Sequence, residues 1–184
     1  MSTLKTTYLQ HPSSASTNLE LKSDGTVTGT SIYTPPSTLI AVGRWNGETV
    51  TYSASWQKRS IFDTVNVDIN RGGFTVESDG VTVPANGIYS VHYVIQFQSA
   101  VQRAAPATSM GVNDNEAAPY DYPLLSFTGY MRNVDGHNNS TNSASGIMEL
   151  NSGDKLNMFI LNDATSGSID VISNGSWAVH RISE

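Results

Sequence analysis

Residues 74–91 read FTVESDGVTVPANGIYSV, and this stretch decides the fold. The strand-forming run Val81–Val83 ends at Pro84, which has no N–H to donate to a sheet ladder. Gly87 then permits a backbone conformation that other residues resist, so the chain can turn there. Tyr89 follows as the first large side chain of a new strand. The stretch therefore predicts two strands joined by a short connection.

Apolar and polar side chains alternate with a period of two after this connection. Such alternation is typical of antiparallel strands that bury one face. Between residues 89 and 97 the shared face consists of Tyr89, Val91, Tyr93, Ile95 and Phe97. The pattern predicts a long strand with an apolar, aromatic-rich face.

The same period recurs along the chain from Leu39 onward. It predicts one strand over Thr49–Trp56 and another over Ile61–Ile69, in which Val65, Val67 and Ile69 share a face. Further strands are expected at Phe74–Val76, Val81–Val83, Leu124–Met131, Gly146–Leu150, Lys155–Leu161, Ser168–Ile172 and Ser176–Ile182. Turn signals, among them Ser173-Asn174-Gly175, separate these strands. We expect an all-β fold: an antiparallel jelly-roll sandwich of about eight to ten strands with an extended N-terminal arm.

The composition agrees with an all-β chain and excludes several functions. The chain has 184 residues, a net charge of −6, 14% charged residues and no cysteine. Its polarity comes mainly from Ser, Thr and Asn, which are poor helix formers. Without cysteine there is no disulfide framework, thiolate zinc site or cysteine nucleophile. The acidic balance argues against nucleic acid as a partner, and no apolar run is long enough to predict membrane insertion.

Residues 1–37 form a region distinct from residues 38–184. Pro35-Pro36 closes this region, and Leu19–Leu21 and Val27 flank Asp24-Gly25 in the pattern of a small hairpin. The region has too little apolar surface for a core of its own. It is either a disordered tail or an arm that docks on a partner, and we expect a docking arm.

Two long segments, Ala104–Pro123 and Arg132–Ser145, are predicted to be loops on the β scaffold. Long loops on a rigid scaffold are frequent recognition sites. Aromatic and amide side chains in them suit a receptor or a glycan. The candidate tip residues are Asp114, Tyr120, Tyr122, His137 and Asn138. The alternative is that both segments are plain polar loops.

The sequence offers little catalytic chemistry. The four histidines lack metal-ligand spacing, and there is no nucleophile elbow, phosphate loop or dinucleotide fingerprint. Asp114, Glu116 and Asp121 fit no standard calcium loop and read as a solvated acidic turn. We expect no enzyme, no cofactor and no metal.

Three segments resemble the globular head of complement C1q and the related tumour-necrosis-factor-like jelly rolls. They are Ile61–Val65, the opening stretch 74–91 with its Val-Pro-x-x-Gly-Ile-Tyr element, and Gly146–Leu156 with Gly153-Asp154. The family ends in a Phe-Ser-Gly-Phe strand where this chain has Trp177-Ala178-Val179-His180. The resemblance implies a jelly roll over about residues 39–183 and a homotrimer. Residues Tyr89–Phe97 would then supply either the core or the trimer axis.

The N-terminal region resembles the opening of virion structural proteins of marine tailed phages, especially cyanophages. The resemblance lies in Leu4–Ser13, LKTTYLQHPS, and in Asp24–Val27, DGTV. It implies a docking peptide, in which an extended arm adds a strand to a neighbour's sheet. The candidate docking residues are Tyr8, Leu9, His11, Pro12, Leu19 and Leu21.

Together the two resemblances imply a structural protein of a tailed-phage virion, assembled in the host cytoplasm. The favoured role is a trimeric capsid decoration (cement) protein anchored by its arm to other virion proteins. The alternative is a short tail fibre or adhesin that binds a host surface receptor or glycan through its long loops. The absence of a shaft favours decoration. A soluble signalling module of the same family has little support, since the chain shows no signal peptide and no collagen-like stalk.

Overall fold

The computed structural model divides the chain into two compact units, Met1–Ser37 and Thr38–Glu184. In the first unit it describes the backbone of residues 8–9, 19–21 and 27–28. In the second it describes residues 39–51, 53, 55–99, 103–114, 126–132, 138–162 and 167–184. All regular structure in these residues is β-strand, and no helix in them could cross a membrane.

The N-terminal unit contains a three-stranded antiparallel sheet. Its strands are β1 (Tyr8–Leu9), β2 (Leu19–Leu21) and β3 (Val27–Thr28), in the order β1-β2-β3. Leu21 pairs with Val27, so β2 and β3 form the hairpin predicted around Asp24-Gly25. Of the candidate docking residues, His11 and Pro12 lie outside the described residues. The structure describes only the backbone of Tyr8, Leu9, Leu19 and Leu21, so their docking role stays a prediction.

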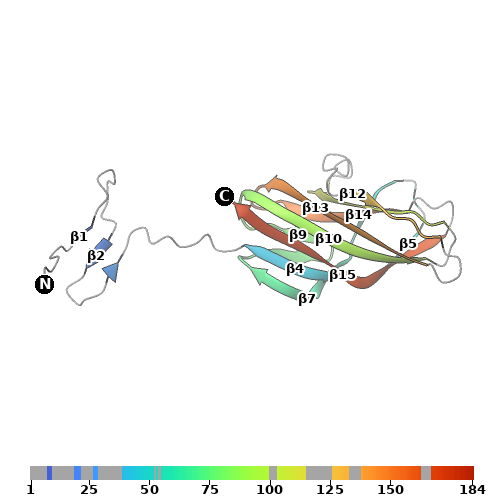
Figure 1. The fold of residues 1–184 in the computed structure, drawn as a ribbon, viewed down its shortest axis with the longest axis horizontal. Coiled ribbons are helices and arrows are strands. Elements are labelled where there is room, and N and C mark those ends of the chain that lie inside the picture. The colour runs from blue at the N-terminus through green and yellow to red at the C-terminus, as the bar shows by residue number, and fades with distance from the viewer. Residues whose placement is uncertain are drawn as a thin grey trace, which may run out of the picture. The chain divides into compact units, whose positions relative to one another are not determined.

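The C-terminal unit is a sandwich of two antiparallel sheets (Figure 1). One sheet, here called the β10 sheet, has the order β13-β10-β15-β4-β7, and β5 also pairs with β15. Its strands are β4 (Ile40–Trp45), β5 (Glu48–Thr51), β7 (Phe62–Arg71), β10 (Gly87–Ser99), β13 (Asn139–Leu150) and β15 (Ser168–Ser183).

The other sheet, the β14 sheet, has the order β12-β11-β14-β9-β8, and β6 also pairs with β14. Its strands are β6 (Gln57–Arg59), β8 (Thr75–Glu77), β9 (Gly80–Thr82), β11 (Pro106–Val112), β12 (Ser126–Thr128) and β14 (Lys155–Asn162). Side chains of both sheets form one hydrophobic core. The all-β jelly-roll sandwich predicted from the sequence is therefore confirmed.

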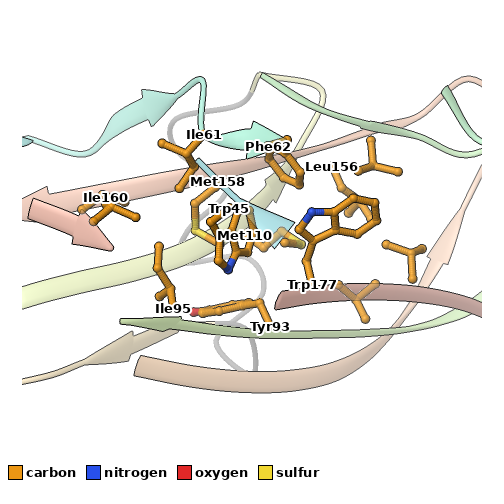
Figure 2. Close-up of a cluster of buried hydrophobic side chains, with 14 of the residues drawn as sticks. Trp45, Ile61, Phe62, Tyr93, Ile95, Met110, Leu156, Met158, Ile160 and Trp177 are labelled. Atoms are coloured by element: carbon orange, nitrogen blue, oxygen red, sulfur yellow. The ribbon is translucent and has the colours of Figure 1, made fainter. Parts of the chain in front are cut away.

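Buried aromatic side chains fill the middle of the sandwich. Figure 2 shows Trp45, Phe62 and Trp177 packed together, with Met110 and Met158 of the β14 sheet beside them. The ring centroids of Trp45 and Phe62 are 4.9 Å apart with an edge-on orientation, and those of Phe62 and Trp177 are 5.7 Å apart. Large rings in such offset arrangements contribute much of the burial energy of a core.

The buried face predicted for Ile61–Ile69 is wrong. Val65 is 86% exposed, Ile69 is exposed too, and the buried residues are Ile61, Phe62 and Asp63. The Asp63 carboxylate accepts hydrogen bonds from the N–H groups of Val65 and Asn66, at 2.8 and 3.0 Å. A side chain that bonds its own backbone in this way competes with the sheet ladder and bulges the strand.

The single strand predicted over Thr49–Trp56 is also wrong. The chain leaves the β10 sheet at Thr51, where β5 ends, and enters the β14 sheet at Gln57, where β6 begins. Val50 is buried as the period implied, but Trp56 is only half-buried. The alternation of apolar and polar residues therefore continues from one sheet into the other, and it does not mark a single strand.

Both predicted loops contain strands. Pro106–Val112 is β11, and residues 139–145 belong to β13. These stretches are rich in Ser, Thr, Asn and Gly, and they become strands because each pairs with a long neighbour, β14 and β10 respectively. The predicted turn at Ser173-Asn174-Gly175 is a bulge inside the continuous strand β15.

Candidate subunit interface

The aromatic-rich face of β10 belongs to the core of the protomer. Tyr89, Val91, Tyr93, Ile95 and Phe97 are all 0% exposed. They point toward the β14 sheet, and they pack with its residues in one cluster. Because a side chain that is fully buried within one chain cannot contact another chain, these five residues form the core and not a trimer axis.

The opposite face of the β10 sheet carries exposed apolar side chains. Ile88 on β10, Ile147 on β13 and Ile182 on β15 point away from the core, and Ile147 is 64% exposed. Strand register brings them close: Ser90 pairs with Ile147 on one side and with His180 on the other. We call this surface, together with Ile40 and Val42 on β4, the apolar face.

The middle of the apolar face carries no acidic side chain, lysine or arginine. Successive outward positions of β10 after Ile88 are Ser90, His92 and Val94, and β15 contributes Ala178 and His180. Charged side chains, such as Glu149 and Arg71, stand at its margins. An apolar patch without acidic side chains, lysine or arginine, on a chain of net charge −6, is a candidate protein contact surface.

A second apolar surface lies at the edge of the β14 sheet. Phe127 in β12 and Tyr130 just after it are 44% and 59% exposed. They flank Gly129, whose position approaches β13 so closely that a β-carbon there would lie 2.3 Å from Asn142 Oδ1. The close approach fixes this segment against β13. We call Phe127 and Tyr130 the aromatic edge.

Of the predicted tip residues, the structure describes Asp114 and Asn138. Tyr120, Tyr122 and His137 lie outside the described residues. Asp114 is in an ion pair with Lys58, with 2.8 Å between Oδ1 and Nζ. Asn138 directly precedes β13, and its carbonyl accepts a hydrogen bond from the N–H of Ser99. The receptor or glycan role of this tip stays a prediction.

Charged side chains cluster on the outer surface of the β14 sheet. Lys155 Nζ lies 2.5 Å from Asp79 Oδ1 and 2.8 Å from Glu77 Oε2, while Lys58 contacts Asp79 and Asp114. The hydrogen bond from Lys155 is the main reason that the pKa of Asp79 is lowered. The cluster connects β6, β8 and β14 with the turn between β8 and β9, which holds Asp79. Its two lysines pair with all three carboxylates, so the cluster suits cross-strand stabilisation rather than cation binding.

No set of three metal-ligating side chains occurs among the described residues. The most strongly shifted group there is Tyr93, whose burial raises its pKa to about 12. Its hydroxyl lies 3.0 Å from Thr108 Oγ1, in a polar cluster inside the sandwich with Asn142. A phenol that stays neutral and faces the core has no access to a substrate, so its role is structural.

Comparison with known proteins defines the fold. No family model matches the chain, and no curated protein matches it. Among solved structures, it is similar to one described as the Eiger TNF from S. frugiperda, with a TM-score of 0.50 and 14% sequence identity. The match covers 79% of this chain and 93% of that one. The protein therefore has a TNF-like jelly-roll fold, in agreement with the resemblance seen in its sequence.

Proposed function

We propose that this chain is a structural protein of a tailed-phage virion, built as a homotrimer of jelly rolls and attached to the particle by residues 1–37. The observation that carries the proposal is the presence of two separate exposed apolar surfaces on one protomer, the apolar face and the aromatic edge. The resemblance of Leu4–Ser13 to phage virion proteins supports the location. Such a protein acts by burial of surface and strand addition, without turnover.

The positions of the two surfaces favour a ring. One covers the outside of the β10 sheet and the other lies on β12, at the edge of the opposite sheet. A contact between them is head-to-tail, and a head-to-tail contact closes into a ring when the rotation between subunits is threefold. A ring would remove Ile147 and Tyr130 from water, which is favourable at about 25 cal/mol per Å² of apolar surface. The TNF-like fold is compatible with this trimer.

Capsid decoration is the role that we propose first. A trimer with three arms would clamp neighbouring shell subunits, because each arm can add its strand to a different neighbour. The second candidate is a short tail fibre or adhesin, which is favoured by an open polar cleft lined by Arg44, Asp68 and residues 173–176. Copy number per particle separates the two, because a decoration protein covers the whole shell and is present in many more copies than a tail appendage.

The assembly is tested by analytical ultracentrifugation of the full chain at micromolar concentration. We expect a species of three times the 19.8 kDa chain mass. Ile147→Glu should convert it to monomers, since it places a charge in the apolar face. Thr75→Glu is the matched control, because Thr75 is an exposed β-strand residue on the edge strand β8 of the other sheet. A wild-type monomer, or a trimer indifferent to Ile147→Glu, would contradict the proposal.

The location is tested separately on purified particles of the virus that encodes the chain. Quantitative mass spectrometry should find the chain with the capsid proteins. Particles stripped of it should burst more easily under osmotic shock if it decorates the head, whereas an adhesin would be needed for adsorption and not for head strength. A chain absent from particles would exclude both roles while leaving the trimer result intact.

A further inference from the structure

Two bulges flank strand β4 at the same level. On one side, Ile95 pairs with Gly175 and Gln96 with Ile172, so Ser173 and Asn174 of β15 have no partner on β10. On the other side, β7 has bulged, because Gly43 pairs with Val67 and Trp45 with Phe62. The four residues of β7 between Phe62 and Val67 therefore have only Arg44 opposite them on β4. Near Arg44, β7 deviates from its ladder with β4, and β15 deviates from its ladder with β10.

An open cleft of about 430 Å³ lies between these bulges. Its lining comes from β4, β7 and β15, and it consists of Arg44, Asp68, Ser173, Asn174, Gly175 and Ser176. The side chains of Ser173, Asn174 and Ser176 make no hydrogen bond with any residue that the structure describes. Their donors and acceptors are directed to solvent or to a ligand.

Buried tryptophans hold the backbone on which the cleft is built. Trp45 Nε1 donates to the carbonyl of Val94 at 2.8 Å, and Trp177 Nε1 donates to the carbonyl of Arg44 at 3.1 Å. A β-carbon at Gly175 would lie 2.4 Å from the Val94 carbonyl oxygen, so only glycine allows β15 to approach β10 here. The base of the cleft is therefore fixed before any ligand binds, which lowers the entropic cost of binding.

The polar groups of the cleft are paired so that they offer no net charge. Arg44 Nε and Nη2 donate to the Asp68 carboxylate at 3.2 and 3.3 Å. The guanidinium keeps further N–H donors and the carboxylate keeps further acceptor positions. Asp68, and Asp63 near Arg44, oppose an anionic ligand, while Arg44 opposes a metal ion.

We propose that this cleft binds a neutral sugar. Neighbouring hydroxyl groups on a sugar ring each donate and accept a hydrogen bond, and the Arg44–Asp68 pair offers a donor beside an acceptor. The Asn174 amide offers a second such pair, and the serine hydroxyls adapt to either role. The cleft adjoins the apolar face, since Ser176 pairs with Val94, and the site differs from the predicted tip at Tyr120, Tyr122 and His137.

Saturation-transfer difference NMR on the full chain tests the proposal. The probes are the methyl glycosides of glucose, galactose, mannose and N-acetylglucosamine, with methyl glucuronide as the anionic comparison. We expect at least one neutral glycoside to receive saturation, with millimolar affinity. Asn174→Ala should weaken its binding at least fivefold, and Ser173→Trp should abolish it by filling the cleft.

Asn139→Ala is the matched control, because Asn139 is an exposed asparagine on β13, at the far edge of the same sheet. Its binding should equal that of the wild type. Far-ultraviolet circular dichroism checks that each variant is folded. Three results would overturn the proposal. The first is that no neutral glycoside receives saturation, and the second is that only methyl glucuronide does. The third is that Ser173→Trp binds the neutral glycoside as well as the wild type does.

Discussion

The indole ring of Trp177 lies against the backbone of Gly43, and a β-carbon at position 43 would be 2.4 Å from ring atom Cζ2. The two residues are directly paired on β15 and β4. The ring cannot move aside easily, because it packs against Phe62 and its Nε1 is bonded to the Arg44 carbonyl. Position 43 therefore needs glycine because the packed indole leaves no room for a side chain. Its backbone φ is not positive, so the backbone conformation is not the reason for glycine there.

Replacement of Gly43 by alanine should lower the free energy of unfolding by about 3 kcal/mol, because a methyl group overpacks a dense core. Denaturant unfolding, followed by tryptophan fluorescence, measures this. Gly153→Ala is the comparison: its φ is +92° but the space around it is open, so only backbone strain of about 1 kcal/mol is expected. Equal losses in the two variants would show that the Trp177 contact is unimportant.

Asp79→Asn should destabilise the protein by about 1 kcal/mol at pH 7, since it removes the carboxylate that Lys155 and Lys58 share. The folded state lowers the pKa of Asp79 below its usual 3.8. Its contribution is therefore complete above about pH 4 and is lost as the pH falls through the lowered value. Urea unfolding of both proteins between pH 7 and pH 3 measures the difference.

The difference between wild type and Asp79→Asn should therefore shrink toward pH 3. Glu184→Gln is the control, because its ion pair with Arg181 is long and Glu184 is largely exposed. That variant should stay within about 0.5 kcal/mol of the wild type at every pH. A difference for Asp79→Asn that stays constant down to pH 3 would refute this account of the cluster.

The sequence was sufficient for the long strand β10 and not for the edge strand β7. In β10 every second residue from Tyr89 to Phe97 is apolar and buried, so period and burial agree. In β7 the period is equally clear, but Asp63 binds its own backbone and Val65 becomes exposed. The alternation of residue types takes no account of a side chain that binds its own backbone, and this one hydrogen bond is why the predicted burial of Val65 is wrong.

The candidate interface could have been anticipated in part. Ile88 and Ile147 occupy outward positions next to the buried Tyr89 and Met148, and a large apolar residue out of phase with the buried set is a signal of a contact surface. The cleft beside Arg44 could not have been anticipated from the sequence, because Ser173-Asn174-Gly175 has the composition of a turn. Only pairing with β10 converts it into a bulge.

Tyr93→Phe should make the protein less sensitive to alkali. In the wild type, burial raises the pKa of Tyr93 from 10.0 to about 12. Its contribution to stability is therefore complete below pH 10 and is lost as the pH rises toward 12, since the unfolded chain ionises first. By pH 11.5 this loss of stability amounts to roughly 2 kcal/mol. It is smaller than the full effect of a pKa difference of about two units, because each unit corresponds to about 1.36 kcal/mol and the folded protein has itself begun to ionise.

Denaturant unfolding of both proteins from pH 8 to pH 11.5 measures this. At pH 8 the variant should be about 1 kcal/mol less stable, because it loses the hydrogen bond to Thr108. Above pH 10 the two curves should converge or cross. Parallel curves over the whole range would contradict a raised pKa of Tyr93 in the folded protein.

Deletion of residues 1–37 should separate assembly from attachment. The core lies in strands β4–β15, and the chain divides between Ser37 and Thr38, so residues 38–184 retain every described core contact. If the apolar face and the aromatic edge drive assembly, the truncated chain should unfold with unchanged midpoint and sediment as a trimer. If the chain is the virion protein proposed above and the arm is its docking peptide, the truncated chain should no longer bind particles from which the full-length protein has been stripped. The full chain should rebind to them, and co-sedimentation measures both. A truncated trimer that rebinds normally would remove the docking role from the arm and transfer it to the jelly roll.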